Sequence, residues 1–130
     1  MHKQHRLVLT FIDVMHQLFF VDLMGKIPSR TKNRNFAPVS FEKFPNCKLV
    51  IDCTDIQIHI PKKMNLQRAT YSSYRGYNSF KLLIGVAPNG VITFVSDLYP
   101  GAISDKNITL QSGILEQISE GDLILADKRF

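Results

Sequence analysis

The chain has 130 residues, of which 45% are hydrophobic and 21% are charged. This length suits one domain whose core buries roughly two thirds of the unfolded surface, and the composition excludes general disorder. Residues 1–81 carry 13 Lys and Arg against 5 Asp and Glu, whereas residues 82–130 carry 3 against 6. A polyanion such as nucleic acid would therefore be drawn to the first two thirds of the chain.

Two cysteines, Cys47 and Cys53, form no CxxC pair, which favours a reducing compartment and argues against a zinc site. The apolar stretch 7–24 contains two aspartates and a histidine, so it falls short of the roughly 20 apolar residues of a membrane span. No small-residue cleavage site follows it, which argues against a signal peptide.

The first predicted element is a buried helix over residues 6–24, ended by Gly25 and Pro28. Its apolar residues recur at intervals of three and four, namely Val8, Phe11, Ile12, Met15, Leu18 and Phe19. Residues 26–45 contain three prolines and the cluster SRTKNRN, which predicts a loop with a basic bias.

A long strand is predicted from Lys48 to Ile60, because KLVIDCT is apolar and β-branched and DIQIHI alternates strictly before Pro61. Residues 61–78 show no sustained period and are expected to form an exposed basic loop. The apolar runs 81–87 and 91–96 flank an Asn-Gly pair, which predicts a hairpin.

A helix is expected to begin at Ser104 as N-cap, with Asp105 in its first turn. Its apolar face would comprise Ile108, Ile114, Leu115 and Ile118, which requires the helix to tolerate Gly113 and to end at Gly121. Residues 123–126, LILA, form an unbroken apolar run typical of a central strand that is buried on both sheet faces.

Two aspartates follow apolar runs of this kind, Asp52 after KLVI and Asp127 after LILA. A strand that follows a helical crossover usually returns parallel to the same sheet. If the last strand lies beside the first, both carboxylates are expected at one sheet edge, with their oxygens within roughly 3 to 6 Å, close enough to share a divalent ion. A turn or cap role is the alternative for either residue alone.

Several linked blocks resemble the DDE endonuclease domain of Harbinger-type transposases and their domesticated nuclear relatives. The blocks are LVIDCT, SSYRGYNSFKLLIGVAPNGVITFVSDLYPGAISDKNI and GDLILADKRF, in the order and spacing of that family. The resemblance covers about residue 27 to the end, and IPSRT and FEKFPNCKLVIDCT resemble the lead into the first catalytic strand.

This resemblance implies an RNase H-like mixed sheet with antiparallel hairpins, a helix and a parallel strand. It also implies catalytic carboxylates at Asp52 and Asp127 that bind a divalent metal ion, Mg or Mn, for cleavage and transfer of DNA phosphodiester bonds. The third acid of the family, a glutamate, would lie beyond Phe130, so we expect a domain truncated at its C-terminus, without its last strand and helices. Arg129 stands where the family usually has Gly, which would hinder a tight turn or place a cation near the metal.

The predicted DNA-binding residues lie in the basic segment after the first strand. They combine cations for phosphates with rings that stack on bases, namely Lys62, Lys63, Arg68, Tyr74 and Arg75. A solvated loop without DNA contacts is the alternative for this segment.

Asp55 is expected either to support the metal site formed by Asp52 and Asp127 or to lie on the strand surface. The four histidines show no metal-ligand spacing.

The sequence thus predicts a helical segment, 1–26, and a partial nuclease domain, 27–130, with DNA as partner and the nucleus as location. The 130 residues alone are expected to be inactive. The fragment is also expected to be marginally stable or prone to associate. Its possible partners are a second copy of the chain, in a homo-oligomer, and another protein that recognises the DNA end. The alternative function is a non-catalytic DNA-binding or protein-interaction module that keeps the fold.

Overall fold

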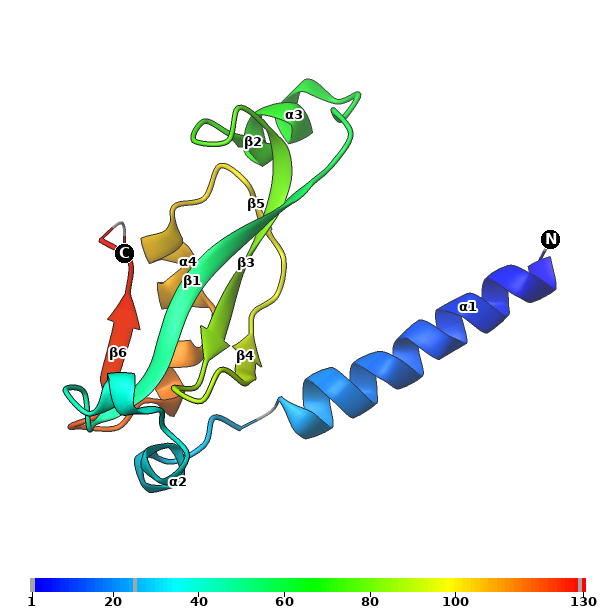
Figure 1. Ribbon diagram of the computed structural model, residues 1–130. Coiled ribbons are helices and arrows are strands. Elements are labelled where there is room, and N and C mark those ends of the chain that lie inside the picture. Colours follow the sequence, from blue (N-terminus) through cyan, green and yellow to red (C-terminus); the bar gives the residue numbers. More distant parts are fainter. Residues whose placement is uncertain (1, 25, 129) are drawn as a thin grey trace.

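A computed structural model describes residues 2–24, 26–128 and 130 (Figure 1). The elements in chain order are α1 (His2–Met15), η1 (His16–Leu23), α2 (Arg30–Asn35), η2 (Val39–Phe41), β1 (Cys47–Gln57), α3 (Met64–Thr70), β2 (Tyr71–Ser72), β3 (Tyr77–Val86), β4 (Ile92–Val95), β5 (Tyr99–Pro100), α4 (Asp105–Gln111), η3 (Ile114–Gln117) and β6 (Leu123–Ala126). The mixed six-stranded sheet and its crossover helix make an RNase H-like fold, as predicted.

Strand β1 forms the middle of the sheet, between β3 and β6. Its apolar, β-branched sequence pairs antiparallel with β3 from Val50 opposite Val86 to Gln57 opposite Ser79. The predicted hairpin is confirmed: β3 continues into β4 through a turn in which Gly90 has a φ of 87°, a left-handed conformation that glycine adopts without a steric penalty.

The crossover through α4 returns β6 parallel to β1, with Leu49 opposite Ile124 and Ile51 opposite Ala126. Ser104 caps α4 as expected, its Oγ accepting the Asn107 N–H at 3.3 Å. The predicted helix does not continue through Gly113, whose φ of 77° ends it, and the separate 3₁₀ turn η3 follows. This correction follows from the freedom of glycine to adopt a left-handed backbone.

The core lies on one face of the sheet, where β1, β3 and β4 pack against the crossover segment (Figure 1). Its buried members are Leu49, Ile51, Cys53, Leu83, Phe94, Ile108 and Ile114. Side chains alternate along a strand, so the register places other apolar side chains on the opposite face, where they are only partly buried: Val50, Leu82, Ile84, Val86 and Leu125.

The last strand, β6, is a correction to the expectation of a central strand buried on both faces. Within the described residues it forms one edge of the sheet, and its side chains are partly exposed or, at Ala126, exposed. An unbroken apolar run fits a buried strand, but it does not by itself reveal how many neighbours the strand has.

The N-terminal helix forms as predicted but is not buried. It projects away from the sheet (Figure 1), and its apolar side chains from Leu7 to Phe19 are exposed. Only its last turn approaches the domain, where Phe20 and Met24 share a hollow with β4. Gly25, the predicted stop, lies outside the described residues. Within the described chain, none of the helices is long and apolar enough to span a membrane.

Two segments predicted as loops contain short helices. In residues 26–45, Ser29 caps α2 and Asn33 donates its side-chain amide to the Lys48 carbonyl at 2.8 Å. In residues 61–78, α3 has no side-chain N-cap but is fastened by Asn78, which donates to Gln67 and Thr70. These long-range hydrogen bonds have no periodic signature in the sequence.

Candidate functional site

The two predicted site aspartates follow a pair of residues that face each other across parallel strands. Ile51 pairs with Ala126, so the next residues are Asp52 and Asp127. Ile51 faces the core, and alternation directs the Asp52 side chain to the opposite face. Both aspartates are exposed. The predicted parallel topology is confirmed, and it makes positions 52 and 127 neighbours. The expected place at a strand end is wrong for Asp52, which lies within β1 opposite Ile84 of β3, because β1 continues to Gln57.

Each carboxylate accepts the N–H of the residue that follows it. Oδ1 of Asp52 accepts the Cys53 N–H at 2.8 Å, and Oδ1 of Asp127 accepts the Lys128 N–H at 2.6 Å. Hydrogen bonds of this kind restrict the rotation of the carboxylate. The site therefore presents two oriented, hard oxygen groups to solvent.

This donor set suits magnesium or manganese, which are commonly held by one or two carboxylates together with waters and substrate phosphates. No group of three or more His, Cys, Asp and Glu side chains is positioned to hold a metal ion among the residues that the structure describes. The two aspartates fit a divalent ion as part of a ligand set, and not as a complete cage.

A family comparison matches the model for DDE superfamily endonucleases to residues 51–130, which include both aspartates, all of β6 and β1 from Ile51 onward. The chain belongs to this family. Comparisons with curated proteins and with solved structures gave no match. Endonucleases of this family act on DNA and generally use divalent metal ions, and membership indicates a nuclease domain of transposase descent.

In this DDE endonuclease domain, an ion pair that sequence reasoning missed holds the two site strands together. Lys48 Nζ lies 2.8 Å from Asp122 Oδ2, and Arg30 Nε lies 3.2 Å from Asp122 Oδ1. Burial raises the pKa of Asp122, but hydrogen bonds from Lys48 and the Ser119 N–H, with the charges of Lys48 and Arg30, outweigh it and lower the pKa. A lone lysine at the start of an apolar strand was the available signal, since such a cation requires a partner.

Asp55 and Asp105 lie on the core side of the sheet and are not beside Asp52. Asp55 accepts hydrogen bonds from Ser79 Oγ at 2.8 Å and Arg75 Nε at 3.3 Å. Asp105 stands in the first turn of α4, as predicted, and pairs with Lys81 at 3.0 Å. Together with Cys53 these residues line a hollow of about 200 Å³.

The thiol of Cys53 sits between charged groups in this hollow. Burial, together with the nearby Asp105 carboxylate, raises its pKa to about 12, although the Lys81 ammonium opposes the shift. A thiol with so high a pKa is neutral near pH 7 and a weak nucleophile. Cys53 therefore packs in the domain as a small apolar residue.

The predicted DNA-binding residues lie along the segment that follows β1. Strand β1 continues for five residues after Asp52, so this segment begins roughly 17 Å from Asp52 along the strand. Lys62, Lys63 and Arg68 are exposed, whereas the guanidinium of Arg75 pairs with Asp55 and lies 5.3 Å from the centre of the Tyr74 ring. The segment therefore presents exposed cations, but Arg75 is partly neutralised.

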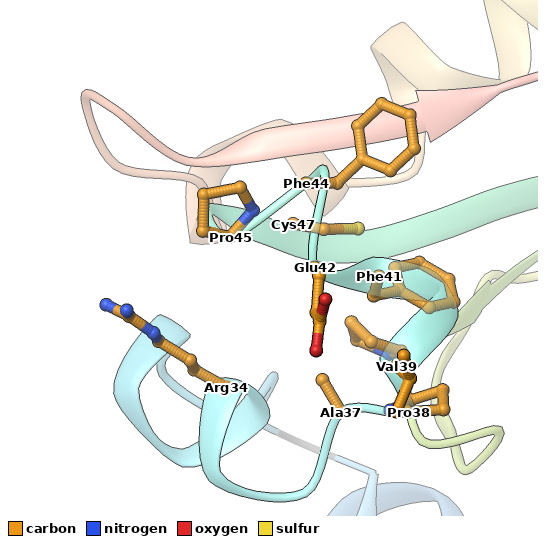
Figure 2. Close-up of a pocket in the computed structure, with 10 residues that line it drawn as sticks. Arg34, Ala37, Pro38, Val39, Phe41, Glu42, Phe44, Pro45 and Cys47 are labelled. Carbon is orange, nitrogen blue, oxygen red and sulfur yellow. The ribbon is translucent and has the colours of Figure 1, made fainter.

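A further cavity of about 290 Å³ lies at the amino end of β1, the opposite end of the strand from the aspartates (Figure 2). Apolar side chains such as Val39, Phe41 and Phe44 line it together with Arg34, and the carboxylate of Glu42 is directed into it in Figure 2. This cavity shares no residue with the candidate metal site.

Three histidines, His5, His16 and His59, are exposed on the surface of the protein. Arg129, expected near the metal, lies outside the described residues.

Proposed function

We propose that this chain is a Harbinger-type, transposase-derived DDE endonuclease domain whose inherited chemistry is divalent-metal-dependent hydrolysis and transfer of DNA phosphodiester bonds. The observation that supports it is the parallel register of β1 and β6, which makes Asp52 and Asp127 neighbours within the segment that matches the family. In this proposal the two aspartates are the metal ligands supplied by these strands.

The residues of the chain would act by binding and orientation. Asp52 and Asp127 supply anionic oxygens, and the N–H groups of Cys53 and Lys128 hold those carboxylates in place. These aspartates would hold a divalent ion, whose chemistry when bound would be to activate the attacking water and stabilise the leaving oxygen. Exposure of both aspartates leaves room for a DNA phosphate.

The expected activity of the 130 residues alone is low. Two carboxylates bind a divalent ion weakly without further ligands, and the described residues bring no third acidic side chain into the group. We expect no nicking of supercoiled plasmid above that of the Asp52→Ala variant, with either magnesium or manganese. Robust nicking that Asp52→Ala abolishes would contradict this expectation.

Metal binding tests the site itself without requiring turnover. Isothermal titration with Mn²⁺ should give a weak site in the wild type that either Asp52→Asn or Asp127→Asn reduces at least about tenfold, because half of the anionic ligand charge is removed. The control is Asp97→Asn, which removes an exposed carboxylate elsewhere. Equal binding by the wild type and both site variants would refute the assignment.

A second candidate function is a non-catalytic DNA-binding module that keeps the fold. It is favoured by the exposed cations of the segment 62–68 and by the absence of a third acid from the described site. DNA binding that survives Asp52→Asn and falls with salt would support this function. Binding that requires both aspartates and metal would favour the nuclease.

We also propose nuclear residence and a division into a helical segment, 1–26, and a nuclease domain, 27–130. Proteolysis that releases a stable fragment beginning near residue 27 would support the division, because the helix makes few contacts with the sheet. Imaging of a tagged chain tests the location, and cytoplasmic retention would contradict it.

A further inference from the structure

The N-terminal helix presents an apolar stripe that no residue of the described chain covers. Val8, Phe11, Ile12, Met15, Leu18 and Phe19 make up this stripe, and each of them is between 47% and 66% exposed. Arg6, Thr10, Asp13 and Gln17 repeat at intervals of four, three and four along the opposite side. The stripe is thus exposed on a helix that projects away from the sheet (Figure 1), and Leu7, Leu9 and Val14 beside it are exposed as well.

The size of the stripe is that of a protein interface. An aromatic side chain contributes roughly 150–250 Å², so six large apolar side chains that are half exposed offer on the order of 600 Å². Monomeric proteins rarely expose more than this in one patch, and a specific interface buries about 600–1,000 Å² per partner. A helix of this length in water is also only marginally stable without a packing surface.

The charges of the helix favour a second copy in the antiparallel orientation. Residues 1–12 contain Lys3 and Arg6 and no acid, whereas residues 13–24 contain Asp13 and Asp22 and no Lys or Arg. Arg6 and Asp13 lie on the side opposite the stripe, so they flank such a pair and do not form its contact. An antiparallel pair still aligns the basic half of each helix with the acidic half of the other, whereas a parallel pair aligns halves of like sign.

The apolar stripe has the same self-complementarity. It extends from residue 8 to residue 19, so its midpoint falls between residues 13 and 14. A twofold axis at this point places Val8 of one copy beside Phe19 of the other and superimposes the two stripes. Such an interface is isologous, with the same patch on both subunits, as in most homodimers.

A membrane surface fits this helix less well. Helices that bind anionic lipid surfaces carry many Lys and Arg on the polar side, whereas residues 1–24 contain two basic residues, Lys3 and Arg6, against two aspartates. We propose that α1 and η1 form the dimer interface of this protein, by antiparallel packing against the same helix of a second copy. This inference does not depend on the proposed nuclease chemistry.

Sedimentation equilibrium of the full chain tests the dimer. We expect the wild type to be dimeric in the micromolar range and Phe11→Glu to raise the dissociation constant about 100-fold or more, since a twofold interface buries the introduced charge twice. Gln17→Glu is the matched control: it adds the same charge to the same helix on the polar side and should leave the dimer intact. Circular dichroism of each variant checks that the domain remains folded.

Spin labels test the orientation. Nitroxides on a Gln4→Cys variant should lie about 25–30 Å apart in an antiparallel dimer, because each label is some nine residues from the midpoint at 1.5 Å per residue. A parallel pair would bring them within about 15 Å. A monomeric wild type at about 100 µM, equal effects of the Phe11 and Gln17 variants, a short label distance, or a monomer that binds lipid vesicles would each overturn the inference.

Discussion

Lys48 and Asp122 form a buried ion pair that ties the start of β1 to the turn that leads into β6. The Lys48 Nζ to Asp122 Oδ2 distance is 2.8 Å, and side-chain exposures are 9% and 3%. Next to this pair, the Leu123 N–H donates to the Asn46 carbonyl at 2.9 Å. These contacts begin the parallel register that ends at Asp52 and Asp127, so the pair positions the candidate site from about five residues away.

Removal of one partner of this pair should be costly. We expect Asp122→Asn to lower the free energy of unfolding by about 3–5 kcal/mol, because it leaves the Lys48 ammonium buried and unpaired. Urea unfolding followed by circular dichroism measures the change. Asp97→Asn, at an exposed site, should change stability by less than about 0.5 kcal/mol, and an equally small effect of Asp122→Asn would show that the pair is not structural.

The Asp122 carboxylate should make the free energy of unfolding depend on pH in the acidic range. The pKa of Asp122 is lowered in the folded protein, so its contribution is fully present above the unfolded pKa of about 3.9 and is lost as the pH falls through the lower folded value. The difference in unfolding free energy between wild type and Asp122→Asn should be constant from about pH 5 to 7 and shrink below about pH 4. A difference that does not vary down to pH 2 would contradict the lowered pKa.

Neither cysteine should react in the folded protein. Burial raises the pKa of both thiols, that of Cys53 to about 12, so only about one Cys53 in 10,000 is a thiolate at pH 8. Ellman's reagent should titrate no thiol within minutes in buffer and two in urea. Ser73→Cys, at an exposed position, is the positive control, and rapid titration of a native cysteine would show that the core opens readily.

The basic segment should contribute to DNA binding through counterion release. If Lys62 and Lys63 contact phosphates, each Lys→Gln substitution should reduce the slope of log K against log salt by about 0.9. Arg75→Gln should have a smaller effect, because Asp55 already pairs with that guanidinium. Lys106→Gln on α4 is the control at an exposed site. Fluorescence anisotropy with a short duplex measures these slopes, and identical slopes for all variants would exclude this surface.

Local signals in the sequence predicted those elements that local interactions stabilise. The Asn-Gly pair placed the turn between β3 and β4, where Gly90 adopts its left-handed conformation, and Ser104 marked the start of α4. The apolar runs before Asp52 and Asp127, with the crossover rule, predicted the parallel pairing that brings those positions together. These features depend on a few adjacent residues and on chain topology.

Only the tertiary structure decided the features that depend on partners distant in sequence. It showed that residues 4–19 are helical yet exposed, since a hydrophobic period reports which side of a helix is apolar and not what covers it. It also revealed α3, which side-chain hydrogen bonds from Asn78 hold, and the pair of Lys48 with Asp122 across 74 positions. Such contacts form only when the chain folds, because the two partners carry no common local pattern.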